Sequence, residues 1–273
     1  MSCENNLFLG DSYDTPGEGR RSWLDKLLCG CRLHYYLRNF GVFALTGACA
    51  KRGNLNQFRQ IEYSNRNIRI VEACGGKIHI RGLDKLRALN GEPVVLIGNH
   101  MSSLETALLH AIVRPYLDFT FVIKESLLHV PFFGWIMVAL DAIAVSRNNP
   151  REDLKTVLTR GKELLASGKS IILFPQASRE VEFNPESSFN SIGVKLARGA
   201  GVKIVPFALK TDFVGVGKYF REFGPLHREK EIYFEFGDPI TITGNGKEEL
   251  QQMAQFTYDR LSKWNRLETV KAE

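Results

Sequence analysis

The chain has 273 residues and a formal net charge of +6, with 44% hydrophobic and 24% charged residues. This composition is ordinary for a globular protein and excludes a disordered chain as the default description; the length suits one large α/β domain with or without a small extension. The positive charge suits a nucleic acid, an anionic membrane surface or a phosphorylated substrate, and it does not choose among them.

The N-terminal part of the chain is predicted to be an extension of the main domain. Residues 1–21 are polar and Gly-rich, which predicts a flexible leader without the apolar core of a signal peptide. Residues 22–51 carry apolar and aromatic residues at helical spacing with Lys and Arg between them. Such a segment can lie in a membrane interface or pack on the main domain, and both alternatives stay open. We divide the chain into an extension, 1–60, and a domain, 61–273.

Two absences in the sequence limit the possible chemistry. The five cysteines all lie in the first 74 residues, and their odd number without a C-x-x-C pair predicts neither a disulfide framework nor a metal site. The longest apolar stretches, 40–50 and 130–145, are too short or too interrupted to span a bilayer. A protein of this kind touches a membrane only by lying on it.

From residue 56 onward, helical and strand-like patterns alternate. The expected helices are 56–74, 102–113, one that starts at Asn149-Pro150 and stops at Gly168, 192–199 and 251–264; the expected strands are 77–81, 94–98, 119–123, 142–145, 170–174, 203–207 and a late edge strand at 231–236. The alternation predicts an α/β fold, with a single mixed or mostly parallel sheet flanked by helices and an N-terminal helical extension.

Polar residues follow four of the expected strands. His100 comes after VVLIGN, Lys124 after FTFVI, Arg147 after AIAVS and Arg179 after ILFPQAS. Ligands of α/β sheets bind at the carboxyl ends of the strands. The sequence therefore predicts one histidine and three cations around a common opening.

His100 is the candidate catalytic base of that opening. It precedes a helix with Ser102 as the expected N-cap, and the positive end of a helix disfavours an imidazolium, which keeps the ring able to accept a proton. Glu105 can orient the ring and stabilise the charge it gains. Ser102 to Glu105 also fits the S-x-x-E capping box, so Glu105 has a structural alternative.

No sequence motif for another catalytic or binding chemistry is complete in this chain. The chain has no full phosphate loop, no third glycine of a dinucleotide loop, no G-x-S-x-G nucleophile and no nucleic-acid-binding signature. A histidine base without a protein nucleophile suits direct attack by a substrate hydroxyl on an activated acyl group.

Four ordered blocks resemble the glycerolipid acyltransferase family, which includes the bacterial 1-acylglycerol-3-phosphate acyltransferases. Asn99-His100-x4-Glu105 resembles its N-H-x4-D motif. The second block consists of Lys124, Pro131-x-x-Gly134 and the strand ending at Arg147. The third, Phe174-Pro175-Gln176-Ala177-Ser178-Arg179, resembles F-P-E-G-T-R. The fourth is Val205-Pro206. Together they cover roughly 77–239.

The resemblance implies transfer of a fatty acyl group from acyl-CoA or acyl-carrier protein, as co-substrate, to the hydroxyl of a lysophospholipid at a membrane surface. His100 would be the base and Glu105 its partner. Substrate-binding residues would be Lys124, Arg147, Gln176, Ser178 and Arg179, with the cations on the phosphate. It implies no cofactor, no metal, no nucleic acid and a peripheral position on the cytoplasmic side of a membrane.

This chain departs from the family pattern in the first and third of these four blocks. Glu105 replaces aspartate, and Gln176, Ala177 and Ser178 replace glutamate, glycine and threonine. The first change keeps the charge of the pair, whereas the others leave the acceptor open. The alternatives are another lysophospholipid or lyso-aminolipid acceptor, a thioesterase in which water replaces the alcohol, and a non-catalytic lipid-binding module.

Overall fold

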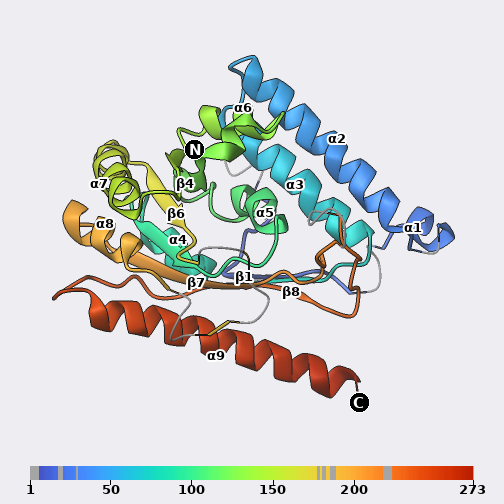
Figure 1. Ribbon diagram of the computed structural model, residues 1–273. Helices are drawn as coiled ribbons and strands as arrows, with labels where there is room; N and C mark the ends of the chain where they lie inside the picture. Colours follow the sequence, from blue (N-terminus) through green and yellow to red (C-terminus); the bar gives the residue numbers. More distant parts are fainter. Residues whose placement is uncertain are drawn as a thin grey trace.

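An eight-stranded sheet lies at the centre of the computed structural model, which describes residues 6–17, 21–28, 30–176, 179, 183–184, 189–217 and 223–272 (Figure 1). Its strand order is β1-β2-β8-β7-β3-β6-β4-β5. The strands are β1 Ser12–Asp14, β2 Ile78–Arg81, β3 Val95–Gly98, β4 Phe119–Lys124, β5 Ile143–Val145, β6 Ser170–Leu173, β7 Ile204–Lys210 and β8 Ile232–Phe236.

The strands β7, β3, β6, β4 and β5 are parallel, so their carboxyl ends meet at one edge of the sheet. On the other side of β7, β8 runs antiparallel to it, β2 runs parallel to β8, and β1 runs antiparallel to β2. The predicted mixed α/β sheet is confirmed, and the edge predicted to carry the site exists as one continuous row.

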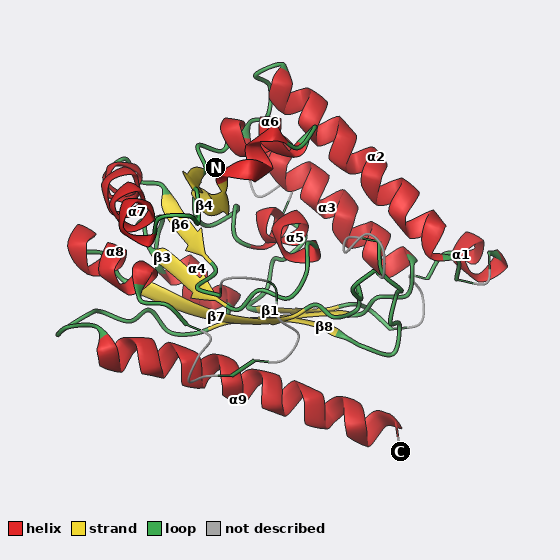
Figure 2. Cartoon of the chain, viewed as in Figure 1, coloured by secondary structure: helices red, strands yellow, loops and turns green. Residues whose placement is uncertain are grey.

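Helices cover both faces of the sheet (Figure 2). They are α1 Trp23–Leu27, α2 Arg32–Lys51, α3 Gln57–Ala73, α4 Leu83–Ala88, α5 Leu104–Ile112, the 3-10 helix η2 Glu125–His129, α6 Phe133–Ala139, α7 Pro150–Ala166, α8 Ile192–Ala200 and α9 Lys247–Ala272. Successive side chains of a strand point to opposite faces. Val95 and Ile97 of β3 accordingly join the core under α7 and α8, and Leu96 joins the core under α5.

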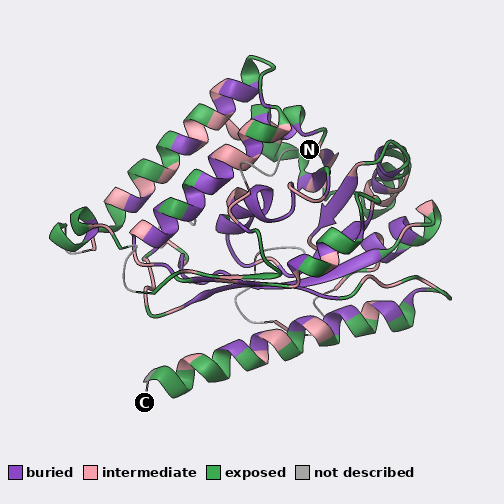
Figure 3. Ribbon diagram, turned by 180° about the vertical axis from the view of Figure 1, so that it is seen from behind, coloured by how far each residue is buried: buried purple, intermediate pink, exposed green. Residues whose placement is uncertain are grey.

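Local sequence signals place several of these helices as predicted. Asn149 accepts hydrogen bonds from the backbone N–H groups of Arg151 and Glu152, and Pro150 takes the first helical position of α7. Asn56 caps α3 by accepting from the N–H of Arg59. Figure 3 shows that α9 turns its buried residues to the sheet and its exposed ones outward. This helix runs well beyond the predicted 251–264.

The expectation of a flexible leader is wrong for the described part of residues 1–21. Ser12–Asp14 pairs with β2 as an edge strand, and Phe8 is buried against the ring of Tyr13. Three residues are too few to show an alternating pattern. The strand exists because β2 offers it unpaired backbone groups, which is a tertiary cause that local sequence does not contain.

The prediction of an edge strand at 231–236 is also wrong. β8 lies between β2 and β7 and is therefore an interior strand, with its backbone paired on both sides. The N-terminal strands β2 and β1 lie beyond β8 in the sheet, in the order β8-β2-β1. The true edges among the described strands are β1 and β5.

The predicted helix 22–51 is two helices, α1 and α2, because the chain turns at Gly30, which has a φ of +69°. α2 packs along α3 and α6 (Figure 1), and a Cβ at Gly47 would lie 2.5 Å from the Cβ of Phe132. Packing on the domain, one of the two alternatives, is thus present.

In the parts of the chain that the structure describes, no helix is both long and apolar enough to cross a membrane. Residue 60 lies inside α3. The division of the chain into an extension, 1–60, and a domain, 61–273, stays a prediction.

Candidate active site

The turn after β3 is anchored to the neighbouring strand β7. A Cβ at Gly98 would lie 2.5 Å from the backbone oxygen of Phe207, so only glycine allows this close pairing. The next residue, Asn99, is buried and bonds both backbone groups of Leu209, donating to its oxygen at 2.8 Å and accepting from its N–H at 2.9 Å. The residue that follows, His100, therefore leaves the sheet from a fixed point.

His100 and Glu105 form a hydrogen-bonded pair through Nδ1 and Oε2. A carboxylate accepts hydrogen bonds and does not donate them, so Nδ1 is the donor of this pair, and in the neutral imidazole Nε2 carries the lone pair. The imidazole stacks on Phe174 with ring centroids 4.3 Å apart, and 23% of the side chain is exposed. The ring is therefore fixed on one side and open to a substrate on another.

Glu105 orients His100 and also holds the start of α5. Its side chain is fully buried, and Oε1 accepts from the N–H of Met101 at 2.8 Å, the N–H of Ser102 at 2.6 Å and the hydroxyl of Thr211 at 2.6 Å. The bond to the Ser102 N–H is the glutamate half of the predicted capping box. The box is incomplete, because the helix starts one residue later than predicted and Ser103, at the N-cap position, makes no side-chain cap hydrogen bond. The two alternatives for Glu105 coexist because each uses a different oxygen.

The three predicted cations share the edge but lie at different distances from His100. Arg179 follows β6, the neighbour of β3, and borders a small hollow together with Met101, Ser102 and Ser103. Lys124 ends β4 and Arg147 follows β5, two and three strands from β3, or about 10 and 14 Å at the usual strand spacing. The structure brings Arg179 to the His100 turn and leaves the other two farther along the edge.

Gln176 lies behind the His100 turn. Its side-chain oxygen accepts from the backbone N–H of His100 at 2.6 Å, and the residue is 4% exposed. This burial favours support of the turn over the direct substrate contact predicted from the motif. Ser178, predicted to bind substrate, and Ala177 beside it lie outside the described residues.

Thr211 is a residue of the site that sequence reasoning missed. It follows β7 directly, is fully buried, and reaches Glu105 from across the sheet. The predicted strand stopped at 207, whereas β7 runs to Lys210. Had the strand been extended over the apolar residues to its first polar ones, Thr211 would have joined the other strand-end residues as a candidate.

Metal-ligand residue types meet once within the described residues, away from His100. Asp25, His34 and Cys74 offer ligand atoms within 4.8 Å of one another. Asp25, however, is already paired with Arg21 and Arg228, at 2.8 and 3.2 Å. Burial, with the charge of Asp25, raises the pKa of the Cys74 thiol to about 11, which keeps it protonated. The ion pair of Asp25 with Arg228 ties α1 to the domain.

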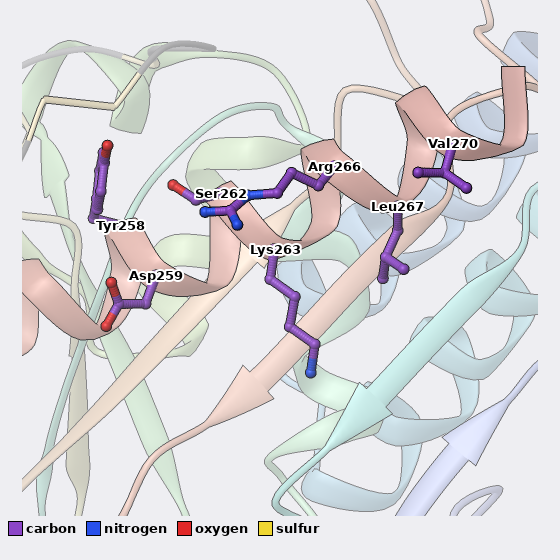
Figure 4. Close-up of a pocket in the computed structure, with 7 residues that line it drawn as sticks. All are labelled: Tyr258, Asp259, Ser262, Lys263, Arg266, Leu267 and Val270. Atoms are coloured by element: carbon purple, nitrogen blue, oxygen red, sulfur yellow. The ribbon is translucent and has the colours of Figure 1, made fainter. Parts of the chain in front are cut away.

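A separate hollow of about 430 Å³ lies along the outer face of α9 (Figure 4). Its lining includes Tyr258, Lys263, Arg266, Leu267 and Val270. α9 covers the face of the sheet opposite to α5, so this hollow takes no part in chemistry at His100 (Figure 1).

Comparison with known proteins identifies the family. The Acyltransferase family model matches residues 77–210, which contain β2 to β7 and both members of the His100–Glu105 pair. Residues 77–210 belong to the acyltransferase family. All four resemblance blocks lie inside the matched region.

Relatives and solved structures of the acyltransferase family agree with this membership. A 1-acyl-sn-glycerol-3-phosphate acyltransferase of Pseudomonas aeruginosa is 29% identical over 67% of this chain and 66% of its own length. A chloroplastic enzyme of the same name from Arabidopsis thaliana is 31% identical over 52% of this chain. The match spans just under two thirds of the first relative and 37% of the second.

The crystal structure of the 1-acyl-sn-glycerophosphate (LPA) acyltransferase PlsC from Thermotoga maritima has the same fold. It superposes with a TM-score of 0.64 at 16% identity and covers 88% of this chain and 96% of that one. The similarity therefore includes strands and helices outside the region of the family model.

Proposed function

We propose that this protein is an O-acyltransferase that moves a fatty acyl group from acyl-CoA or acyl-carrier protein to the free hydroxyl of 1-acylglycerol-3-phosphate, giving phosphatidic acid. One observation carries the proposal: the His100–Glu105 pair lies at the carboxyl edge of the sheet with Arg179 beside the same turn. A base for a hydroxyl and a cation for a phosphate are then adjacent. The names of the relatives support the same acceptor.

His100 would act by moving one proton twice. Its Nε2 takes the proton of the acceptor hydroxyl as that oxygen bonds to the thioester carbonyl carbon. The tetrahedral intermediate then expels the thiolate, which receives the proton from the imidazolium. Glu105 stabilises the imidazolium between the two steps. The hydroxyls of Ser102 and Thr211 are bonded to each other on the Glu105 side, which supports direct transfer without an acyl-enzyme.

The start of α5 offers one donor for the oxyanion of that intermediate. The N–H of Ser102 is bonded to Glu105, and the N–H of Leu104 is bonded to the Ser102 hydroxyl at 3.2 Å. Ser103 lies between them and lines the hollow beside Arg179. We assign the oxyanion contact to its backbone N–H, since preorganised donors at this place stabilise the developing charge.

Arg179 would bind the acceptor phosphate, because its planar fork matches two phosphate oxygens. Lys124 and Arg147, farther along the edge, would extend the cationic surface towards the same phosphate or those of the donor. Gln176 faces the His100 backbone and is absent from the lining of the hollow. The change from the usual glutamate therefore leaves the phosphate side intact, which favours 1-acylglycerol-3-phosphate over other acceptors.

An acceptor panel tests this proposal. The purified protein is given labelled acyl-CoA or acyl-carrier protein with lysophosphatidic acid, a choline or ethanolamine lysophospholipid, or a lyso-aminolipid. We expect transfer to lysophosphatidic acid to exceed transfer to each other acceptor at least about tenfold, a difference of about 1.4 kcal/mol. A preference for an acceptor without a terminal phosphate would contradict the role given to Arg179.

The acceptor is a membrane lipid, so we propose that the protein acts as a peripheral protein on the cytoplasmic surface of a membrane. α1 and α2 expose apolar side chains that a monomer in water has little reason to keep, and cations lie among them. The exposed set includes Trp23 at 73%, Leu27 at 66%, Leu33 at 58% and Leu37 at 63%. We define these four residues as the lipid-facing surface.

Charge placed on the lipid-facing surface should weaken membrane binding. We expect the double variant Leu33→Glu and Leu37→Glu to lose most of its sedimentation with anionic vesicles, since two burials of about 2 kcal/mol each are replaced by repulsion. Val270→Glu, a similar change at a 71% exposed site on α9, is the matched control and should sediment as the wild type does. Equal loss in both proteins would refute this surface.

A further inference from the structure

Thr211 belongs to a directed chain of hydrogen bonds that ends at Glu105. The Ser102 hydroxyl accepts from the N–H of Leu104 at 3.2 Å and donates to Thr211 Oγ1 at 2.9 Å. The Thr211 hydroxyl in turn donates to Glu105 Oε1 at 2.6 Å. Since a carboxylate only accepts, the direction of the whole chain is fixed.

Thr211 is itself held firmly by its neighbours in β7. The backbone of Leu209 is bonded on both groups by the side chain of Asn99. The ammonium of Lys210, which is 1% exposed, is bonded to Asp212 at 2.7 Å and to both carboxylate oxygens of Glu268 on α9 at 2.8 Å. The hydroxyl of Thr211 is thus presented from a rigid point of the sheet.

The two oxygens of Glu105 have different tasks. Oε2 pairs with His100, and Oε1 accepts three hydrogen bonds. Two of the donors, the N–H groups of Met101 and Ser102, belong to the same turn as His100 and move with it. Thr211 is the donor that comes from outside this turn, directly after β7, so it fixes the carboxylate relative to the sheet.

We propose that Thr211 is a positioning residue for the acyl transfer, because its hydroxyl holds the Glu105 carboxylate in the rotation that presents Oε2 to His100. The inference rests on the proposed function, in which Glu105 orients the base. It assigns to the residue that directly follows β7 a part in the site that lies outside the family motifs quoted above.

Removal of the hydroxyl tests the proposal. Thr211→Val keeps the shape of the side chain, and Thr211→Ala removes it without placing a methyl group against Glu105. We expect kcat to fall about 10- to 100-fold in both, the range for a lost hydrogen bond to a charged group, with KM nearly unchanged. Thr211→Ser should recover most of the rate, because it restores the donor.

The matched control is Thr120→Val. Thr120 is a fully buried threonine on β4 whose hydroxyl has no partner in the structure. Its replacement removes the same atoms from a buried strand position without touching Glu105. We expect wild-type kcat and KM from this variant.

A pH profile separates positioning from a general loss of structure. When the carboxylate accepts one hydrogen bond fewer, its negative charge is less neutralised by donors and interacts more strongly with the ring. This stabilises the protonated imidazole. The acid limb of the kcat profile should therefore move to higher pH in Thr211→Val. The charged groups next to the turn, Glu105 on α5 and Arg179 after β6, are the same in all these variants. A purely structural role would lower the unfolding temperature and leave the limb in place.

The outcomes distinguish the two proposals. An inactive His100→Ala together with folded, fully active Thr211→Val and Thr211→Ala would overturn the role of Thr211 and leave the proposed function standing. Wild-type turnover in His100→Ala would overturn the proposed function itself. If Thr211→Val unfolds at the assay temperature, Thr211→Ala and Thr211→Ser decide, since an alanine variant as active as the serine variant contradicts the proposal.

Discussion

Replacement of His100 by alanine is expected to lower kcat by about 10²–10⁴-fold, the usual contribution of a positioned general base. Among the described residues the structure offers no second base in its place: the contacts of the turn are made by the Glu105 carboxylate, the hydroxyls of Ser102 and Thr211, and backbone N–H groups. The ring is partly exposed and rests on Phe174, so its loss should change the free energy of unfolding by only about 1 kcal/mol.

Initial rates and thermal unfolding of the same preparations check this expectation. His129→Ala, which removes an exposed histidine at the end of η2, serves as the control and should retain the wild-type rate. Turnover at the wild-type rate in His100→Ala would contradict the role of His100 as the general base. A large loss of stability in that variant would show that the ring supports the fold more than its contacts indicate.

Replacement of Glu105 by alanine is expected to have the largest combined effect on activity and stability. The rate should fall by about 10²–10⁴-fold, because the base loses the group that orients it. The free energy of unfolding should fall by about 3–5 kcal/mol, since two buried N–H groups and the Thr211 hydroxyl lose their acceptor. Denaturant unfolding and initial rates measure the two effects separately.

Glu105→Asp separates the two tasks of the carboxylate. It keeps the charge but is one methylene shorter, so we expect measurable activity, well above that of the alanine variant. If both variants lost stability and kept the wild-type rate, Glu105 would serve the start of α5 alone. The structure predicts otherwise, because Oε2 is directed to His100 while Oε1 holds the turn.

The central strands and the order of elements were predictable because each depends on a local pattern. β3 is a continuous apolar run, β6 is apolar after Ser170, and α7 carries its own cap in Asn149-Pro150. The positions of β1 and β8 were not predictable in the same way. They depend on which strand offers an unpaired edge, and that is decided by segments far apart in the chain.

The residues of the site also differ in whether local sequence or long-range contacts bring them together. His100 and Glu105 are five residues apart, so their spacing on one turn brings them together and sequence finds both. Arg179 was found because it follows a predicted strand, and the structure shows that this strand, β6, neighbours β3. Thr211 and the buried position of Gln176 depend on contacts across more than seventy residues of sequence, which spacing alone does not reveal.

The fate of a labelled acyl group tests the central claim most directly. The purified protein receives labelled acyl-CoA or acyl-carrier protein with and without lysophosphatidic acid, and the lipid products are separated. Label is expected in phosphatidic acid, in an amount that depends on the acceptor and on His100. Equal release of free fatty acid with and without acceptor would indicate a thioesterase, and vesicle binding without turnover would indicate a lipid-binding module; either result would contradict the account.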